Sequence, residues 1–242
     1  MIKIVDMYRD RLKLDPALDW QMSPEDKACL IDTLSDLRPE VAIEIGTFRG
    51  GSLQVVQAFA RDTYSIDISE EPKSRLSAKF PNVHFLVGPS TRILPELLEK
   101  LSLENRTPGF ILVDGDHSKE GVQTDLHTIL SYPYRNPVTV FAHDCFNPQC
   151  RAGIVGLDYS RYSAVKSVEI DHVLGKTVRI DGLQELWGGF ARILVDPNST
   201  KHYQFINEHQ KEYEQAYKQS SHSISDRLLS PLKKMVRKLL AR

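Results

Sequence analysis

The sequence lacks the features that would assign it to a specialised class of protein. Three cysteines in 242 residues, Cys29, Cys145 and Cys150, are too few for a disulfide framework and include no CxxC pair for zinc. No stretch approaches the roughly 18 apolar residues of a transmembrane helix, and charged residues interrupt the N-terminus where a signal peptide would have an apolar core. We therefore expect a globular protein of the cytoplasm.

A strong overall charge is also absent. The sequence has 31 Lys and Arg against 32 Asp and Glu, a net charge of -1, so we expect no nucleic-acid partner. The charge is uneven, however, because residues 223–242 hold six basic side chains and one acid. Ser230 and Pro231 predict the start of a basic amphipathic helix there. Residues 224–242 could bind an anionic membrane surface peripherally, or pack on their own domain or on a partner subunit.

Short apolar runs alternate with helical stretches through most of the chain. Ser23 and Pro24 predict the start of a first helix, and Pro39 follows its end. The predicted buried strands are 41–45, 63–68, 83–87, 109–113 and 138–142. The helices predicted between them are 51–61, 70–79, 92–101 and 119–131. This alternation is typical of a doubly wound α/β fold with a mostly parallel sheet.

The C-terminal part has a different pattern. Residues 168–180 and 187–195 predict two late strands with no helix between them, which would form an antiparallel hairpin closing the sheet. Residues 199–219 are polar and favour a helix. The predicted domain limits are an N-terminal extension at 1–22, the α/β domain at 23–198, and a helical, basic tail at 199–242.

A glycine-rich turn, EIGTFRGGS, follows the first predicted strand. Gly46 would allow a tight turn and Gly50 would open the next helix, so that backbone N–H groups can approach a ligand. The pattern differs from the dinucleotide fingerprint GxGxxG because Phe48 stands at the second glycine position. Asp67 ends the second strand, where an acid either accepts hydrogen bonds from ribose hydroxyls or is a solvated turn residue.

Polar groups also follow the fourth and fifth strands. Asp114 and Asp144 would project from the same sheet edge and repel each other unless a divalent cation lay between them. His143 could be a third metal ligand or could point into the sheet. His117 could be a general base, or a residue that caps the helix beginning at Ser118.

Five segments together resemble a known family. In order and spacing, EIGTFRGGS, SIDIS, VGPSTRILPEL, VDGDHSKEGVQTDL and FAHD are similar to the class I S-adenosylmethionine-dependent O-methyltransferases, in the branch of the catechol-type and macrolide-sugar enzymes. The resemblance covers roughly residues 23–195 and implies a Rossmann-like methyltransferase fold that binds S-adenosylmethionine and a divalent metal, Mg²⁺.

The resemblance also implies roles for particular residues. Those implied for the cofactor are Glu44, Gly46 and Ser52 near the methionine half, Asp67 at the ribose and Ser90 at the adenine edge; Gly50 and Asp114 are also predicted to bind it. Asp114 and Asp144 would hold the metal, with His143 as the candidate third ligand, and His117 stands where relatives carry a basic residue. One departure is Cys145, a poor Mg²⁺ ligand, where catechol-type enzymes have asparagine. Another is SYPYRNP before the fifth strand, where a glycine pair is frequent in the family.

The function predicted from these features is metal-assisted O-methylation of a hydroxyl on a small molecule or sugar, with His117 and Asp114 in catalysis. The aromatic residues expected near the acceptor are Phe146, Tyr159, Tyr162 and Trp187. Two alternatives remain: a hydroxylase on the same scaffold, and a non-catalytic adaptor that uses its basic tail. A homodimer through the late hairpin is compatible with the sequence.

Overall fold

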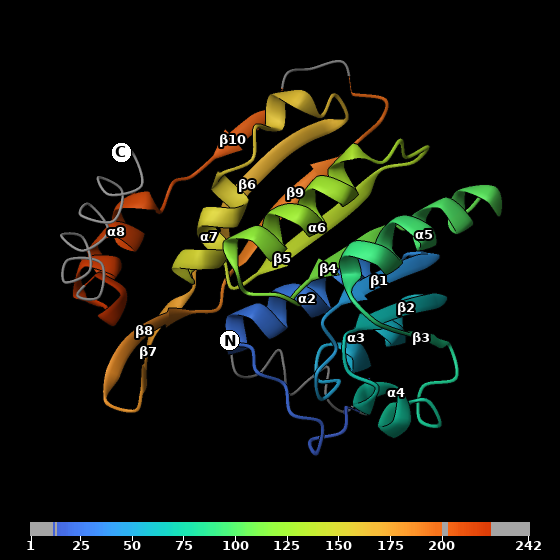
Figure 1. The fold of residues 1–242 in the computed structure, drawn as a ribbon, viewed down its shortest axis with the longest axis horizontal. Helices are drawn as coiled ribbons and strands as arrows, with labels where there is room; N and C mark the ends of the chain where they lie inside the picture. Colours follow the sequence, from blue (N-terminus) through green and yellow to red (C-terminus); the bar gives the residue numbers. More distant parts are fainter. Residues whose placement is uncertain (1–11, 13, 200–202, 224–242) are drawn as a thin grey trace, which may run out of the picture.

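The computed structural model describes residue 12, residues 14–199 and residues 203–223, and its centre is an eight-stranded sheet (Figure 1). The strands of this sheet are β1 (Val41–Ile45), β2 (Asp62–Asp67), β3 (Val83–Val87), β4 (Phe110–Val113), β5 (Val138–His143), β6 (Val165–Val173), β9 (Phe190–Val195) and β10 (Gln204–Ile206). Their order is β10-β6-β9-β5-β4-β1-β2-β3. Only β9 pairs antiparallel, with β5 and β6, so the sheet is mostly parallel as predicted.

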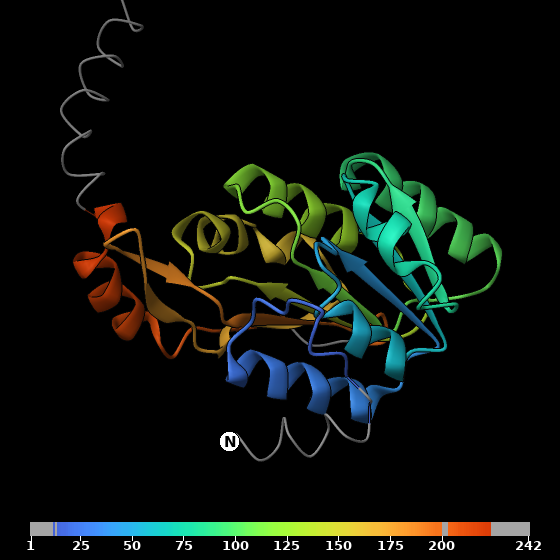
Figure 2. The ribbon, with the colours of Figure 1, turned by 90° about the horizontal axis from the view of Figure 1, so that it is seen from below.

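Helices cover both faces of the sheet. They are α2 (Pro24–Leu37), α3 (Leu53–Phe59), α4 (Glu71–Leu76), α5 (Ser90–Leu103), α6 (Lys119–Ser131), α7 (Pro148–Val155) and α8 (Gln210–Gln219), with a 3₁₀ turn, η1 (Tyr159–Arg161). Helices α2 and α3 lie on one face, and α5, α6 and α7 on the other (Figure 2). This is the Rossmann-like, doubly wound arrangement that the alternating sequence pattern predicts.

The central strands are apolar because both of their faces are covered. Every residue of β1, β4 and β5 is buried. Along β1, Ile43 packs in the cluster on the α5–α6 side and Ala42 in the cluster on the α2–α3 side, as alternation along a strand requires. Parallel pairing brings the carboxyl ends of β1, β2, β4 and β5 to one edge.

The late strands differ from the predicted hairpin. Residues 168–180 do not form one strand: β6 ends at Val173 and pairs with β9 in the main sheet. After Gly175 the chain forms a separate two-stranded sheet, β7 (Lys176–Ile180) and β8 (Leu183–Trp187). This β7–β8 hairpin extends from the sheet beside α8 (Figures 1 and 2). An antiparallel pair of late strands, β6 and β9, is therefore present. Residues 168–180, predicted as one strand, are divided between the main sheet and the β7–β8 sheet.

Segments on both sides of the predicted domain limits contact the central domain, and the limits themselves stay a prediction. Trp20 and Met22, in the predicted extension, pack against the core cluster between α2 and the sheet, and β10, beyond residue 198, pairs in parallel with β6. Helix α8 occupies only the end of the stretch 199–219. The predicted tail helix at 224–242 lies outside the described residues. No helix in the described part of the chain has the length and apolar character needed to cross a bilayer.

Candidate functional site

A cavity of about 780 Å³ opens at the carboxyl ends of β1, β2, β4 and β5. Ligands of open α/β sheets bind at this edge. Predicted site residues that line the cavity are Gly46, Ser52, Asp67, Asp114, His117, His143 and Asp144. Most of the residues predicted from different strand ends are thus brought together by the parallel topology.

The glycine turn after β1 is held in place by Asp67. One carboxylate oxygen, Oδ2, accepts hydrogen bonds from the backbone N–H groups of Thr47 (2.9 Å) and Phe48 (3.0 Å), and Oδ1 accepts from Ser69 N at 2.8 Å. Gly46 has a φ of 87°, and a Cβ there would lie 2.1 Å from the Asp114 carbonyl oxygen. Asp67 is therefore a turn residue that also lines the cavity, and its contact with a ribose stays a prediction.

Glu44 lies beneath the cavity wall. It is fully buried, and its Oε1 accepts a 2.7 Å hydrogen bond from the Ser52 hydroxyl, which itself lines the cavity. Its Oε2 has no hydrogen-bond partner among the described residues. Burial raises the pKa of Glu44 to about 8, and the negative charges of Asp114 and Asp67 act in the same direction. Glu44 therefore contacts the cavity lining through its hydrogen bond with Ser52.

Two other residues predicted to bind the cofactor contact neighbouring side chains outside the cavity lining. Gly50, with a φ of 81°, packs against the Leu76 side chain, and a Cβ there would lie 2.5 Å from Leu76 Cδ1. Ser90 begins α5 and its hydroxyl hydrogen-bonds the carboxyl group of Asp125. Both lie outside the cavity lining as the structure describes it, so their cofactor roles stay predictions.

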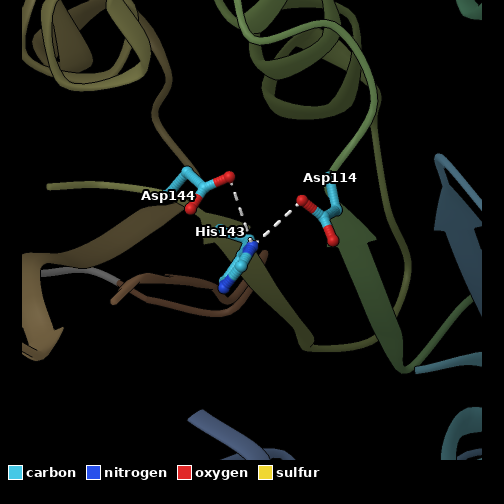
Figure 3. Close-up of side chains that lie close together, drawn as sticks. All are labelled: Asp114, His143 and Asp144. Atoms are coloured by element: carbon cyan, nitrogen blue, oxygen red, sulfur yellow. Dashed lines mark hydrogen bonds and ion pairs between the residues drawn. The ribbon is translucent and has the colours of Figure 1, made fainter. Parts of the chain in front are cut away.

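Asp114, His143 and Asp144 converge at the ends of β4 and β5 (Figure 3). The Nδ1 atom of His143 lies 3.0 Å from Asp114 Oδ1 and 3.6 Å from Asp144 Oδ2. His143 is buried, and Asp144 adopts a left-handed backbone conformation with a φ of 55°. Strained backbone of this kind is frequent at functional sites. His143 thus joins the acids instead of pointing away from them.

Attraction between His143 and Asp114 outweighs the effect of burial on the pKa of both groups. Burial alone would raise the pKa of Asp114, but the facing His143 and His117 rings lower it to about 2. Burial would lower the pKa of His143, but Asp114 and Asp144 raise it well above its usual value. The pKa of Asp144 is raised by its burial. The imidazole of His143 therefore supplies positive charge between the two carboxylates.

His117 is at the mouth of the same cluster. Its Nε2 lies 3.3 Å from Asp144 Oδ2 and 3.5 Å from Asp114 Oδ1, and its ring makes an edge contact with Trp187. The hydrogen bond to Asp114 raises the pKa of His117. The helix-cap interpretation is wrong because Ser118 is the cap of α6, its hydroxyl accepting from Gly121 N at 3.0 Å.

The cavity wall beyond His117 comes from the β7–β8 hairpin and from the segment before α2. Trp187, Val178, Lys176 and Trp20 line it. Of the four aromatic residues expected here only Trp187 does so. The prediction is wrong for the others, which pack elsewhere: Phe146 against Tyr213, and Tyr159 and Tyr162 against each other.

The sequence analysis missed Asp26, which is completely buried in the first turn of α2. Its Oδ2 lies 3.4 Å from His143 Nε2. Ser23 and Asp26 form a capping box, and the spacing of a serine followed three residues later by an acid was the available signal. The signal identifies a helix start but does not indicate which residue the acid contacts.

The donor atoms of Asp114, His143 and Asp144 fit a divalent metal ion. One ligand atom from each residue lies within 4.8 Å of the others, and the second nitrogen of His143 faces a carboxylate, as is usual for metal-bound histidine. Cys145 is no part of the set, because its Sγ faces the Val173 carbonyl. The asparagine next in the chain, Asn147, caps α7.

Comparison with known proteins gives one family match in sequence and several in structure. Residues 43–145 match a family model described as a methyltransferase domain. This range contains the glycine turn, Asp67, and the Asp114, His143 and Asp144 cluster. No curated protein matches the chain.

Three solved structures share the fold at low identity. Cofactor-bound Rv0187 from MTB is 15% identical with a TM-score of 0.53, and covers 81% of this chain and 90% of its own. The O-methyltransferase TomG from Streptomyces achromogenes, involved in tomaymycin synthesis and solved with SAM, is 18% identical with a TM-score of 0.52, covering 81% and 89%. The Bacillus cereus O-methyltransferase solved with SAH is 16% identical with a TM-score of 0.50, covering 81% and 90%.

Proposed function

We propose that this chain, whose residues 43–145 match a family model described as a methyltransferase domain, transfers the methyl group of S-adenosylmethionine to a hydroxyl group of a small molecule or sugar. One observation carries the proposal. A glycine turn held by Asp67, and the His117 imidazole beside Asp114 and Asp144, line the same cavity. The first can bind a nucleoside and the second can remove a proton, which are the two tasks of O-methylation.

S-adenosylmethionine, when bound, supplies a methyl group on a positively charged sulfur. His117 would take the hydroxyl proton of the acceptor as the methyl group passes from the sulfur to the oxygen. Because an ionised carboxylate only accepts hydrogen bonds, the carboxylates near Nε2 keep a hydrogen on that nitrogen. Nδ1 of His117 is then the atom that receives the proton.

The proposal also includes assistance by a metal ion. Asp114, His143 and Asp144 would hold the ion, which would lower the pKa of an adjacent hydroxyl. Mg²⁺ is the ion that the family resemblance implies, whereas an imidazole donor favours a first-row transition ion such as Mn²⁺ or Fe²⁺. Calorimetric titration with Mg²⁺ and Mn²⁺ compares the two directly.

Calorimetric titration with S-adenosylmethionine and S-adenosylhomocysteine tests the proposal at its first step. We expect both to bind, and we expect Asp67→Ala to weaken binding by roughly 1.5–3 kcal/mol, the range of a hydrogen bond to a charged group. A screen of metabolites for a mass increase of one methyl group then identifies the acceptor. Absence of binding at millimolar concentration would contradict the proposal.

A hydroxylase is the second candidate, and one observation favours it. Two imidazoles, from His117 and His143, lie beside the carboxylate of Asp144, and two histidines with one carboxylate are the ligands of many iron-dependent oxygenases. Turnover that requires Fe²⁺ and an oxo-acid, with none from the methyl donor, would support this candidate and reject methyl transfer.

A further inference from the structure

Asp26 is a buried carboxylate that the proposed chemistry does not use. It lies on α2, in the layer below the sheet, and its side chain is fully enclosed. It also lies outside residues 43–145, which match the family model. A buried carboxylate is unfavourable unless it is paired and hydrogen-bonded, so its partners indicate its role.

Three donors surround the two oxygens of Asp26. Oδ2 accepts from Ser23 N at 2.9 Å and faces His143 Nε2 at 3.4 Å, and Oδ1 accepts from Gly189 N at 3.2 Å. The backbone N–H groups of Ser23 and Gly189 both donate to this carboxylate, so it acts as an acceptor of hydrogen bonds. The hydrogen in the contact with His143 is therefore placed on Nε2.

The contact fixes the direction of the whole imidazole ring. With Nε2 held by Asp26, Nδ1 points to the opposite side, where Asp114 Oδ1 lies at 3.0 Å and Asp144 Oδ2 at 3.6 Å. The Phe190 ring packs on His143 at 5.0 Å between centroids. The ring is therefore held between a carboxylate on α2 and the carboxylate pair at the sheet edge. Figure 3 shows its contacts with that pair.

We propose that Asp26 is the positioning residue of the site: it accepts a hydrogen bond from His143 Nε2 and so keeps Nδ1 directed at Asp114 and Asp144. This inference rests on the proposed function in one respect: it takes Asp114 and Asp144 to mark the end of the cavity where the reaction occurs. Outer partners of this kind commonly change activity or metal affinity by about 10- to 100-fold when they are removed.

Asp26→Asn tests the proposal because its shape is retained while one oxygen becomes an NH₂ group. Whichever way the amide turns, the negative charge facing His143 Nε2 is lost and at least one of the three donors loses its acceptor. The readout is a long-range ¹H–¹⁵N spectrum of the histidine rings in the full chain, with the signals of His143 identified by their loss in His143→Gln. We expect Asp26→Asn to move the ring-nitrogen signals of His143.

Two controls separate positioning from damage to α2. Glu25→Gln removes an exposed acid from the same helical turn, and Ile31→Val weakens the packing of the same helix; neither should move the His143 signals. If Asp26→Asn does not fold, the spectrum of the wild-type protein still tests the proposal, because it shows whether Nε2 of His143 carries a hydrogen. A neutral His143 with its hydrogen on Nδ1 would overturn the proposal, as would unchanged signals in a folded Asp26→Asn.

The functional arm uses an acceptor found in the methyl-transfer screen. We expect Asp26→Asn to lower kcat by about 10- to 100-fold while the Kd for S-adenosylhomocysteine stays unchanged. A shifted spectrum with unchanged kcat would reject a positioning role. If the wild-type protein transfers no methyl group, the proposed function fails, but the spectrum still tests the contact between Asp26 and His143.

Discussion

Opposite charges alternate at the reacting end of the cavity, so that Asp26, Asp114 and Asp144 each lie 3.4 Å or less from an imidazole nitrogen of His143 or His117. Pairing makes buried charges tolerable, and removal of one member leaves its partner unpaired in a poorly solvated place. Single substitutions here will therefore combine chemical and structural effects. His117 is the exception, because its side chain is 42% exposed.

His117→Gln is expected to lower turnover by on the order of 10² or more, the usual contribution of one general base. Cofactor affinity and stability should change little, since Ser118 and not His117 caps α6. Kinetic assays with an identified acceptor, together with thermal unfolding, check this prediction. A variant with the wild-type rate would show that another group accepts the proton.

The pH profile gives an independent test of the same base. Asp114 raises the pKa of His117 above 6.5, and a base acts only when it is unprotonated. Activity should therefore fall on the acid side, with an apparent pKa above the ordinary histidine value. A kcat/KM profile between pH 5 and 9 would contradict the assignment if it were flat through this range.

Glu44→Gln should change how stability depends on pH. The carboxyl group has a pKa of about 8 in the folded protein against 4.5 when unfolded, so the folded state binds more protons between these values. Stability is therefore lost as pH rises from 4.5 to 8, by up to about 1.4 kcal/mol for each unit of pKa difference. Denaturant unfolding at pH 5 and pH 8 should show a smaller loss in Glu44→Gln than in wild type.

Residues at strand ends could be predicted from the sequence, because a parallel sheet brings them to one edge. Asp67, Asp114 and Asp144 were identified in this way. Asp26 could not be, since it stands 117 positions from His143 in the chain. Its contact depends on how α2 packs under the sheet, and the capping pattern contains no information about that packing.

At the scale of elements, Arg151 joins three parts of the C-terminal half. From α7 it makes two hydrogen bonds to Asp171 on β6, at 2.7 and 3.0 Å, and another to Gln210 at the start of α8. Its guanidinium also stacks over the Tyr213 ring at 4.0 Å. This buried pair therefore connects α8, and the hairpin beside it, to the main domain.

Arg151→Ala should lower the free energy of unfolding by about 3–5 kcal/mol, because it leaves the carboxylate of Asp171 buried and unpaired. Arg161→Ala, at an exposed position of η1, is the control and should change stability by less than about 0.5 kcal/mol. Chemical denaturation measures both. Replacing both members of the pair, Arg151→Met with Asp171→Leu, should recover part of the loss.

Helices and strands with a regular sequence pattern were predictable from the sequence. A segment that pairs first in one sheet and then in another was not. The first five strands and the helices between them follow from short apolar runs and helical spacing. The predicted burial of the third is wrong, because β3 lies at the sheet edge and none of its residues is buried. The division of 168–180 between β6 and β7 depends on the turn at Gly175, where a Cβ would lie 2.2 Å from Phe146 Cβ. That crowding arises only in the folded molecule, so the residue pattern alone could not show it.

At the scale of the whole molecule, burial should set the order of hydrogen exchange. Amides of β1, β4 and β5 lie in strands whose residues are all buried, whereas β3 and β10 at the sheet edges are partly exposed. We expect the first group to exchange only through global unfolding and the second through local opening. Mass spectrometry of exchanged peptides measures this order. Equal protection of central and edge strands would contradict it.

The β7–β8 hairpin forms one wall of the cavity but is not part of the main sheet, so its sequence can change independently of that sheet. Its strands pair with each other and lie outside the eight-stranded sheet, yet Lys176, Val178 and Trp187 form one wall of the cavity. Substitutions between Lys176 and Trp187 can therefore reshape that wall without breaking a ladder hydrogen bond of the main sheet. Changes confined to these dozen residues would alter which acceptor fits the cavity, while the turn held by Asp67 keeps its sequence and structure.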